Sequence, residues 1–189
     1  IMAALAALAP AVARGGVWMT AALAAAVPLV ATLAYAPHVF QPPSVVRSLD
    51  GLAFLGDERA LVEAAGRLSL APGESLIEAS GDAFGDTGRV SAMTGLPAVL
   101  GWAGHEWLWR NDAAAALARA DQVRVFYTTT DPVARCTVIR RFSIRYVILG
   151  PIEAQQYPDL QTPAILALGP VIHDDAGGRI VQIARDQCP

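Results

Sequence analysis

A short central stretch of the chain, Gly88–Arg110, concentrates side chains that can bind or transform a ligand. Guanidinium groups suit phosphate or carboxylate, and indole rings offer flat faces on which sugar rings can stack. Hydroxyl groups can hydrogen-bond to a sugar, and a histidine next to a glutamate is a candidate acid–base pair. The candidate substrate-binding residues are Arg89, Ser91, Thr94, Trp102, His105, Glu106, Trp109 and Arg110.

A purely structural explanation of the same residues stays open. The two arginines could form internal ion pairs with Glu78, Glu106 or Asp112, and the tryptophans could fill the core. Neighbours in sequence also point apart on a helix, so a histidine and the glutamate after it need not act on one atom.

The sequence lacks the motifs of several other kinds of active or binding site. A zinc-protease motif would need a second histidine where Trp109 stands, no serine lies in a nucleophile elbow, and the glycines at 81, 85 and 88 do not have dinucleotide-binding spacing. We therefore expect no metal and no cofactor. The net charge of −3 excludes the basic face that nucleic acid requires. Cys136 and Cys188 have no metal-binding spacing; they could pair if this part of the chain lies outside the cytoplasm.

The elements that must position the candidate site are regular on both sides of it. Within Gly88–Arg110, four helix-breaking residues interrupt any helical or strand period, so we expect a shaped loop system: Gly95, Pro97, Gly101 and Gly104. The flanking patterns predict a helix over 57–70, a strand over 75–80, helices from Asp112 and Asp131, a strand over 145–149 and a hairpin over 170–184. This order predicts a small mixed-sheet α/β domain over residues 44–189.

The first 40 residues differ in kind, because Arg14 is their only full charge and all 17 carboxylates follow Phe40. Residues 17–40 are long enough to cross a hydrocarbon core of about 30 Å as a transmembrane helix. Residues 1–13 are expected to be the end of a preceding membrane helix. A secretory signal or a buried helix of a soluble protein are the alternatives for this segment. Arg14 in the short turn places the later domain outside the cytoplasm by the positive-inside rule.

The central stretch also carries a resemblance. It follows a pattern close to GR-hydrophobic-S-x-x-TGLP-x-V-x-GW-x-GHE-x-x-WR and in this respect resembles the "YYY" (Chlor-Arch-YYY) multi-pass membrane proteins of bacteria and archaea, a domain-of-unknown-function family. The similarity extends over roughly Ser48 to Ala184. The matching residues are Gly88, Arg89, Ser91, Thr94, Gly95, Leu96, Pro97, Gly101, Trp102, Gly104, His105, Glu106, Trp109 and Arg110.

The resemblance implies a function in the membrane. The family is similar to the GT-C membrane glycosyltransferases, which take a sugar from a polyprenyl-phosphate donor. It implies that this chain is a C-terminal fragment whose catalytic acid lies upstream, in another extracytoplasmic loop. The partners it implies are the lipid bilayer, the rest of a multi-pass bundle and a polyprenyl-phosphate sugar or cell-envelope glycan. The alternative is a non-catalytic module that binds a glycan or a partner protein in a membrane complex.

Overall fold

The computed structural model describes residues 17–39 and 49–188, and the chain divides into two compact units, Ile1–Arg47 and Ser48–Pro189. The membrane-helix end expected at residues 1–13, and the residues 44–48 that begin the predicted domain, lie outside the described residues.

The first unit contains one helix, α2, Val17–Val39, within its described part. Its described side chains, at residues 24–35, are exposed and uncharged. The Thr32 hydroxyl donates a 2.7 Å hydrogen bond to the carbonyl oxygen of Pro28. Among the described residues, no helix combines the length and the apolar character that a membrane crossing requires. The transmembrane prediction for residues 17–40 is therefore not confirmed.

The second unit is an α/β domain built on a four-stranded mixed sheet of order β1-β2-β4-β3, which confirms the predicted sheet type. Strand β1, Ser75–Ile77, pairs in parallel with β2, Ile144–Leu149. The other two strands, β3, Val171–Asp175, and β4, Gly178–Gln182, form an antiparallel hairpin, and β4 pairs antiparallel to β2. The long apolar strand β2 is thus central, as expected for a strand covered on both faces.

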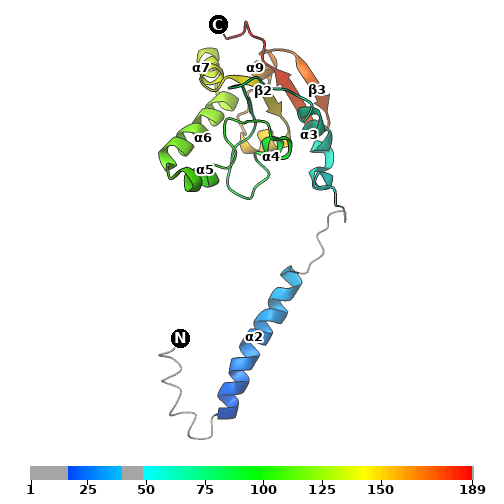
Figure 1. Ribbon diagram of the computed structural model, residues 1–189, viewed down its shortest axis with the longest axis vertical. Helices are drawn as coiled ribbons and strands as arrows, with labels where there is room; N and C mark the ends of the chain where they lie inside the picture. The colour runs from blue at the N-terminus through cyan, green and yellow to red at the C-terminus, as the bar shows by residue number, and fades with distance from the viewer. Residues whose placement is uncertain (1–16, 40–48, 189) are drawn as a thin grey trace. The chain divides into compact units, whose positions relative to one another are not determined.

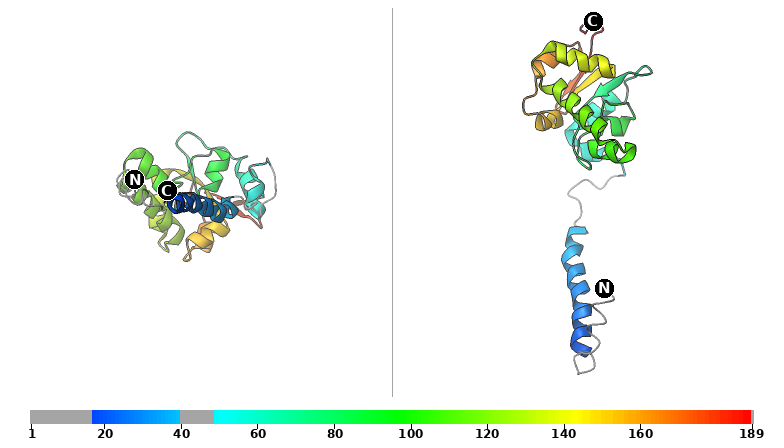
Figure 2. Two further views of the ribbon diagram at one scale, coloured as in Figure 1. Left: turned by 90° about the horizontal axis from the view of Figure 1, so that it is seen from below. Right: turned by 90° about the vertical axis from the view of Figure 1, so that its left-hand side faces the viewer.

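Helices cover both faces of this sheet (Figure 1), and Figure 2 shows the arrangement from two further directions. On one face α6, Ala113–Thr128, and α7, Pro132–Phe142, bury side chains that include Phe126 and Val138 against Val147 and Val181. On the other face the 3-10 helix η2, Ala53–Glu58, and α3, Arg59–Ala65, pack on Leu76, Ile148 and Ile180. The alternation of strand side chains between two cores fixes the register of the sheet.

Two predicted helices begin where their capping residues stand. The Asp112 carboxylate accepts a 3.0 Å hydrogen bond from the Ala115 amide at the start of α6, and Asp131 accepts one of 2.8 Å from Val133 in α7. Pro132 occupies the first turn of α7, where its missing N–H costs nothing. The predicted hairpin is also confirmed: Asp175 accepts hydrogen bonds from Gly177 and Gly178 in the turn.

The expectation of a loop system throughout the central stretch was wrong in part. It contains two helices, α4, Arg89–Thr94, and α5, Ala103–Arg110. Gly88 and Gly95 flank α4 in the left-handed conformation, so these glycines bound a short helix rather than prevent it. The segment between α4 and α5 is irregular, as predicted.

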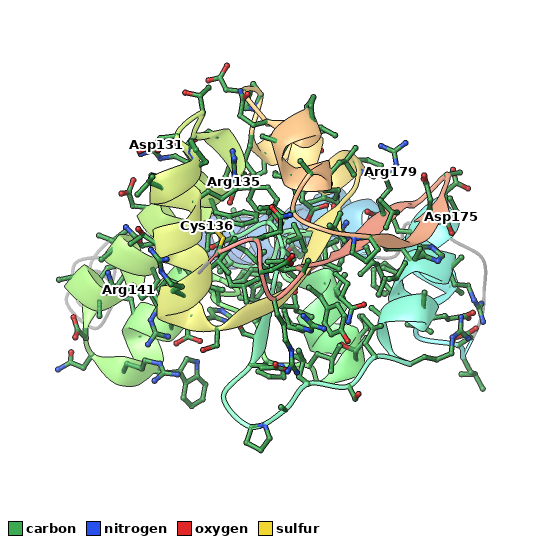
Figure 3. The ribbon with its side chains drawn as sticks, turned by 90° about the horizontal axis from the view of Figure 1, so that it is seen from above. Asp131, Arg135, Cys136, Arg141, Asp175 and Arg179 are labelled. Carbon is green, nitrogen blue, oxygen red and sulfur yellow. A yellow bond between two sulfur atoms is a disulfide. The ribbon has the colours of Figure 1, made fainter. Side chains whose placement is uncertain are left out.

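Two short helices that the sequence patterns did not predict complete the domain. They are α8, Pro151–Gln156, and α9, Thr162–Leu166, and each has a proline in its first turn. A disulfide joins Cys136 of α7 to Cys188 near the end of the chain, with the two Cα atoms 5.3 Å apart. Figure 3 shows Asp131, Cys136 and Arg141 in succession along α7. The pairing that the sequence left open is therefore present.

Candidate functional site

A cavity of about 1040 Å³ opens in the second unit beside α4 and α5. Its wall comes from four parts of the chain: η2, the loop before α4, the central stretch itself, and Ile152 of α8. Aromatic, hydroxyl and charged side chains share the lining, a mixture typical of sites that bind small molecules. The polar and aromatic side chains of the wall are Phe54, Glu58, Phe84, Asp86, Thr87, Arg89, Ser91, Trp102, His105, Glu106, Trp109 and Arg110.

Seven of the eight predicted site residues line this cavity, and Thr94 does not. The Thr94 hydroxyl donates to the carbonyl oxygen of Val90 at 2.6 Å and accepts from the Leu96 amide at 3.3 Å. Thr94 therefore closes the end of α4 rather than facing a ligand. Sequence reasoning missed Phe54, Glu58 and the loop residues before Gly88, since only the fold brings η2 beside the central stretch.

Arg89 is buried and held by two carboxylates. Its guanidinium donates to Glu153 at 3.0 and 3.1 Å and to Glu58 at 2.5 Å. Burial disfavours its charge, but the hydrogen bonds and charges of Glu153 and Glu58 outweigh this cost and raise the pKa of Arg89. Internal ion pairing of Arg89 is thus found, although its partners are Glu58 and Glu153 rather than Glu78.

Two carboxyl groups at the cavity wall, those of Glu58 and Glu78, are partly or fully buried in surroundings of low polarity. Burial raises the pKa of Glu58, against the hydrogen bond and charge of Arg89, and the charges of Glu153 and Asp86 add to the rise. Glu78 is almost fully buried at the end of β1, and burial raises its pKa as well. The low polarity of the surroundings therefore makes a further negative charge costly at this side of the cavity.

Glu78 has a defined structural task. Its two carboxylate oxygens each accept a 2.8 Å hydrogen bond, one from the Val90 amide and one from the Ser91 amide. These are first-turn N–H groups of α4, which would otherwise lack acceptors because Gly88 provides no capping side chain. Glu78 thereby fixes the start of the helix that carries Arg89 and Ser91 into the cavity wall.

Three rings form one side of the cavity. The His105 ring lies edge-on to Phe84 and to Trp102, with centroid distances of 5.1 and 5.0 Å, and the Phe84 and Trp102 rings are 5.8 Å apart. The Trp102 indole N–H donates a 2.8 Å hydrogen bond to the Thr87 carbonyl oxygen. The position of Trp102 is therefore fixed by the loop before α4.

The other two tryptophans of the central stretch do not fill the core. Trp109 lines the cavity and is 86% exposed, and Trp107, outside the lining, is 51% exposed. Arg110 pairs with Glu106 one helical turn before it, as one of the structural alternatives predicted. Glu106 is thus engaged by Arg110 and not by its neighbour His105.

No three metal-ligating side chains gather to hold an ion in the described part of the chain. The site consists of an aromatic wall, buried ion pairs and hydroxyl groups around an open cavity. Comparison with protein-family models, with curated proteins and with solved structures finds no match to this chain.

Proposed function

We propose that the chain is part of a multi-pass membrane glycosyltransferase of the GT-C type that uses a polyprenyl-phosphate-linked sugar. In this proposal the cavity beside α4 and α5 forms the groove for the sugar of the donor or the acceptor. The observation that carries it is the convergence of Trp102, His105 and Trp109 with hydroxyl and charged groups around one cavity. Aromatic faces with a few polar groups suit a sugar ring better than a purely apolar ligand.

The membrane assignment is also part of the proposal. In this proposal residues 17–40 form a transmembrane helix. The sequence of α2 contains no Asp, Glu, Lys or Arg, and its exposed side chains include Val27, Leu29, Val30 and Leu33. The disulfide between Cys136 and Cys188 supports a domain outside the cytoplasm, since such bonds persist in oxidising compartments.

A non-catalytic glycan-binding module is the second candidate. It is favoured by the engagement of both arginines in internal pairs, Arg89 with Glu58 and Glu153 and Arg110 with Glu106, which leaves fewer groups for chemistry. Both candidate functions use the same cavity. They differ in whether the protein transfers the bound sugar or only binds it.

Binding can be tested on the 189-residue chain in detergent micelles. Titration with polyprenyl-phosphate sugars and short glycans is expected to shift the NMR signal of the Trp102 indole N–H saturably. Trp109→Ala should weaken binding about tenfold through loss of a stacking face. Trp107→Ala is the matched control, because this exposed neighbour does not line the cavity.

The outcomes separate the candidates. Binding with transfer of the sugar from the lipid donor in the full-length protein supports the transferase. Binding without transfer supports the glycan-binding module. A flat titration of a well-folded chain would overturn both.

A further inference from the structure

The charges around the cavity are unevenly matched. Two guanidinium groups line it, and each is already paired: Arg110 with Glu106, and Arg89 with Glu58 and Glu153. Arg89 thus serves two carboxylates with one positive charge. An incoming phosphate would have to compete with these carboxylates for the same donors.

Asp86 adds a further negative charge to the lining. It is exposed, and no ion pair joins it to another described residue. Its charge acts on Glu58 across the cavity wall, where it contributes to the raised pKa of that carboxyl group. The uncompensated charge of the cavity is therefore negative, which disfavours an anion and attracts a cation.

The aromatic wall begins two residues before Asp86. Phe84 is 85% exposed and has a φ of +65°, a conformation that a bulky residue adopts at a cost. Its ring contacts those of Trp102 and His105. Contact with a ligand would explain why the strained backbone of Phe84 holds its ring exposed to solvent. The faces of such rings attract cations.

We propose that the cavity selects a sugar that carries a protonated amine, with Asp86 as the carboxylate for the ammonium group and Phe84 and Trp102 as its aromatic walls. This inference rests on the proposed function of the cavity as a sugar site and adds the class of sugar. The rings pack on the apolar face of the sugar, while Asp86 and the field of the buried carboxylates attract the amine.

The test compares glucosamine with N-acetylglucosamine, which has the same ring but a neutral amide. Both are titrated into the full chain below the pKa of the glucosamine amine, with the Trp102 indole N–H as the NMR probe. Glucosamine is expected to bind about tenfold more tightly, as one cation–aromatic or ion-pair contact provides. Asp86→Asn should remove this preference by weakening glucosamine binding about tenfold.

Asp82→Asn is the matched control, since it removes a carboxylate from the same loop but outside the cavity lining. It should preserve the preference for glucosamine. Equal or tighter binding of N-acetylglucosamine would overturn the inference and leave the sugar site intact. A preference that survives Asp86→Asn would also overturn it. Failure of both sugars and of the lipid-linked sugars to bind would overturn the proposed function as well.

Discussion

Single residues decide the electrostatics of the cavity wall. Glu153 is fully buried, and its two oxygens accept hydrogen bonds from Arg89 and from the Ala79 amide. Removing the guanidinium would leave this buried carboxylate without its counter-charge, which is strongly destabilising. Arg89 therefore stabilises the fold as well as lining the cavity. Replacing it should lower the stability of the domain, whatever its effect on ligand binding.

Arg89→Ala is expected to lower the free energy of unfolding by about 3–5 kcal/mol, because it leaves Glu58 and Glu153 without their counter-charge. Urea unfolding measures the loss. Arg110→Ala is the control: its pair with Glu106 is solvent-exposed, so the loss should be less than about 1 kcal/mol. Equal losses for the two variants would contradict this account of the wall.

The pH dependence of stability follows from Glu58. Burial raises its pKa above the ordinary 4.5, so the folded chain holds this proton more tightly than the unfolded chain. Its contribution is therefore most favourable below pH 4.5 and is lost as the pH rises through the raised pKa. Glu58→Gln, which keeps an oxygen for Arg89, should flatten the fall in stability in this interval.

Thermal unfolding across a pH series measures this slope. Glu63→Gln provides the control for removing a carboxylate alone, because Glu63 is a solvent-accessible partner of Arg59 on the next helix. A slope that is unchanged by Glu58→Gln would show that another group carries it.

At the scale of elements, α4 depends on a residue far from it in sequence. Glu78→Ala should destabilise the domain by about 2–3 kcal/mol, because the amides of Val90 and Ser91 lose their buried acceptor. Hydrogen exchange of these two amides should accelerate. Glu74→Ala is the matched control just before β1, where the carboxylate accepts a hydrogen bond from the Ala71 amide in an exposed turn. Unchanged exchange at Val90 would contradict the anchoring role.

Whether a helix or strand depends on nearby or on distant residues explains which elements the sequence could predict. α6 and α7 carry their own caps, Asp112 and Asp131, and β2 contains the apolar run Tyr146–Leu149, so local patterns locate them. α4 has no local cap: its first-turn amides are satisfied by Glu78 across the fold. The sequence around α4 therefore gives no sign of its contact with Glu78, and the flanking glycines resemble those of a loop.

The candidate site also contains residues that the sequence could predict and residues that it could not. Its residues on α4 and α5 are recognisable by type, because arginines, tryptophans and a histidine crowd into one stretch. Glu58 looks in the sequence like an ordinary acidic residue at a helix start. Its place in the wall depends on how η2 packs beside α4, which is a property of the tertiary fold.

At the scale of the whole domain, the disulfide ties α7 to the end of the chain across 52 residues. Chain entropy for a loop of this length predicts a stabilisation of about 4 kcal/mol. Reduction should therefore lower the melting temperature, and Cys136→Ser with Cys188→Ser should reproduce the loss. The chain has no other cysteine, so a reductant acts on this bond alone. An unchanged melting temperature after complete reduction would contradict the prediction.

The hairpin at the end of the domain has a consequence for self-association. β3 is an edge strand whose Val171 and Ile172 are partly exposed, and such an edge can pair with the same strand of another molecule. Pro170 precedes it, and Asp174 and Asp175 end it (Asp175 is labelled in Figure 3). Asp174 pairs with Arg179 of β4, so charged side chains stand at this end of the edge on every copy and hinder the approach of another strand. Replacing both aspartates with asparagine should therefore expose the domain to ordered aggregation that begins at this strand.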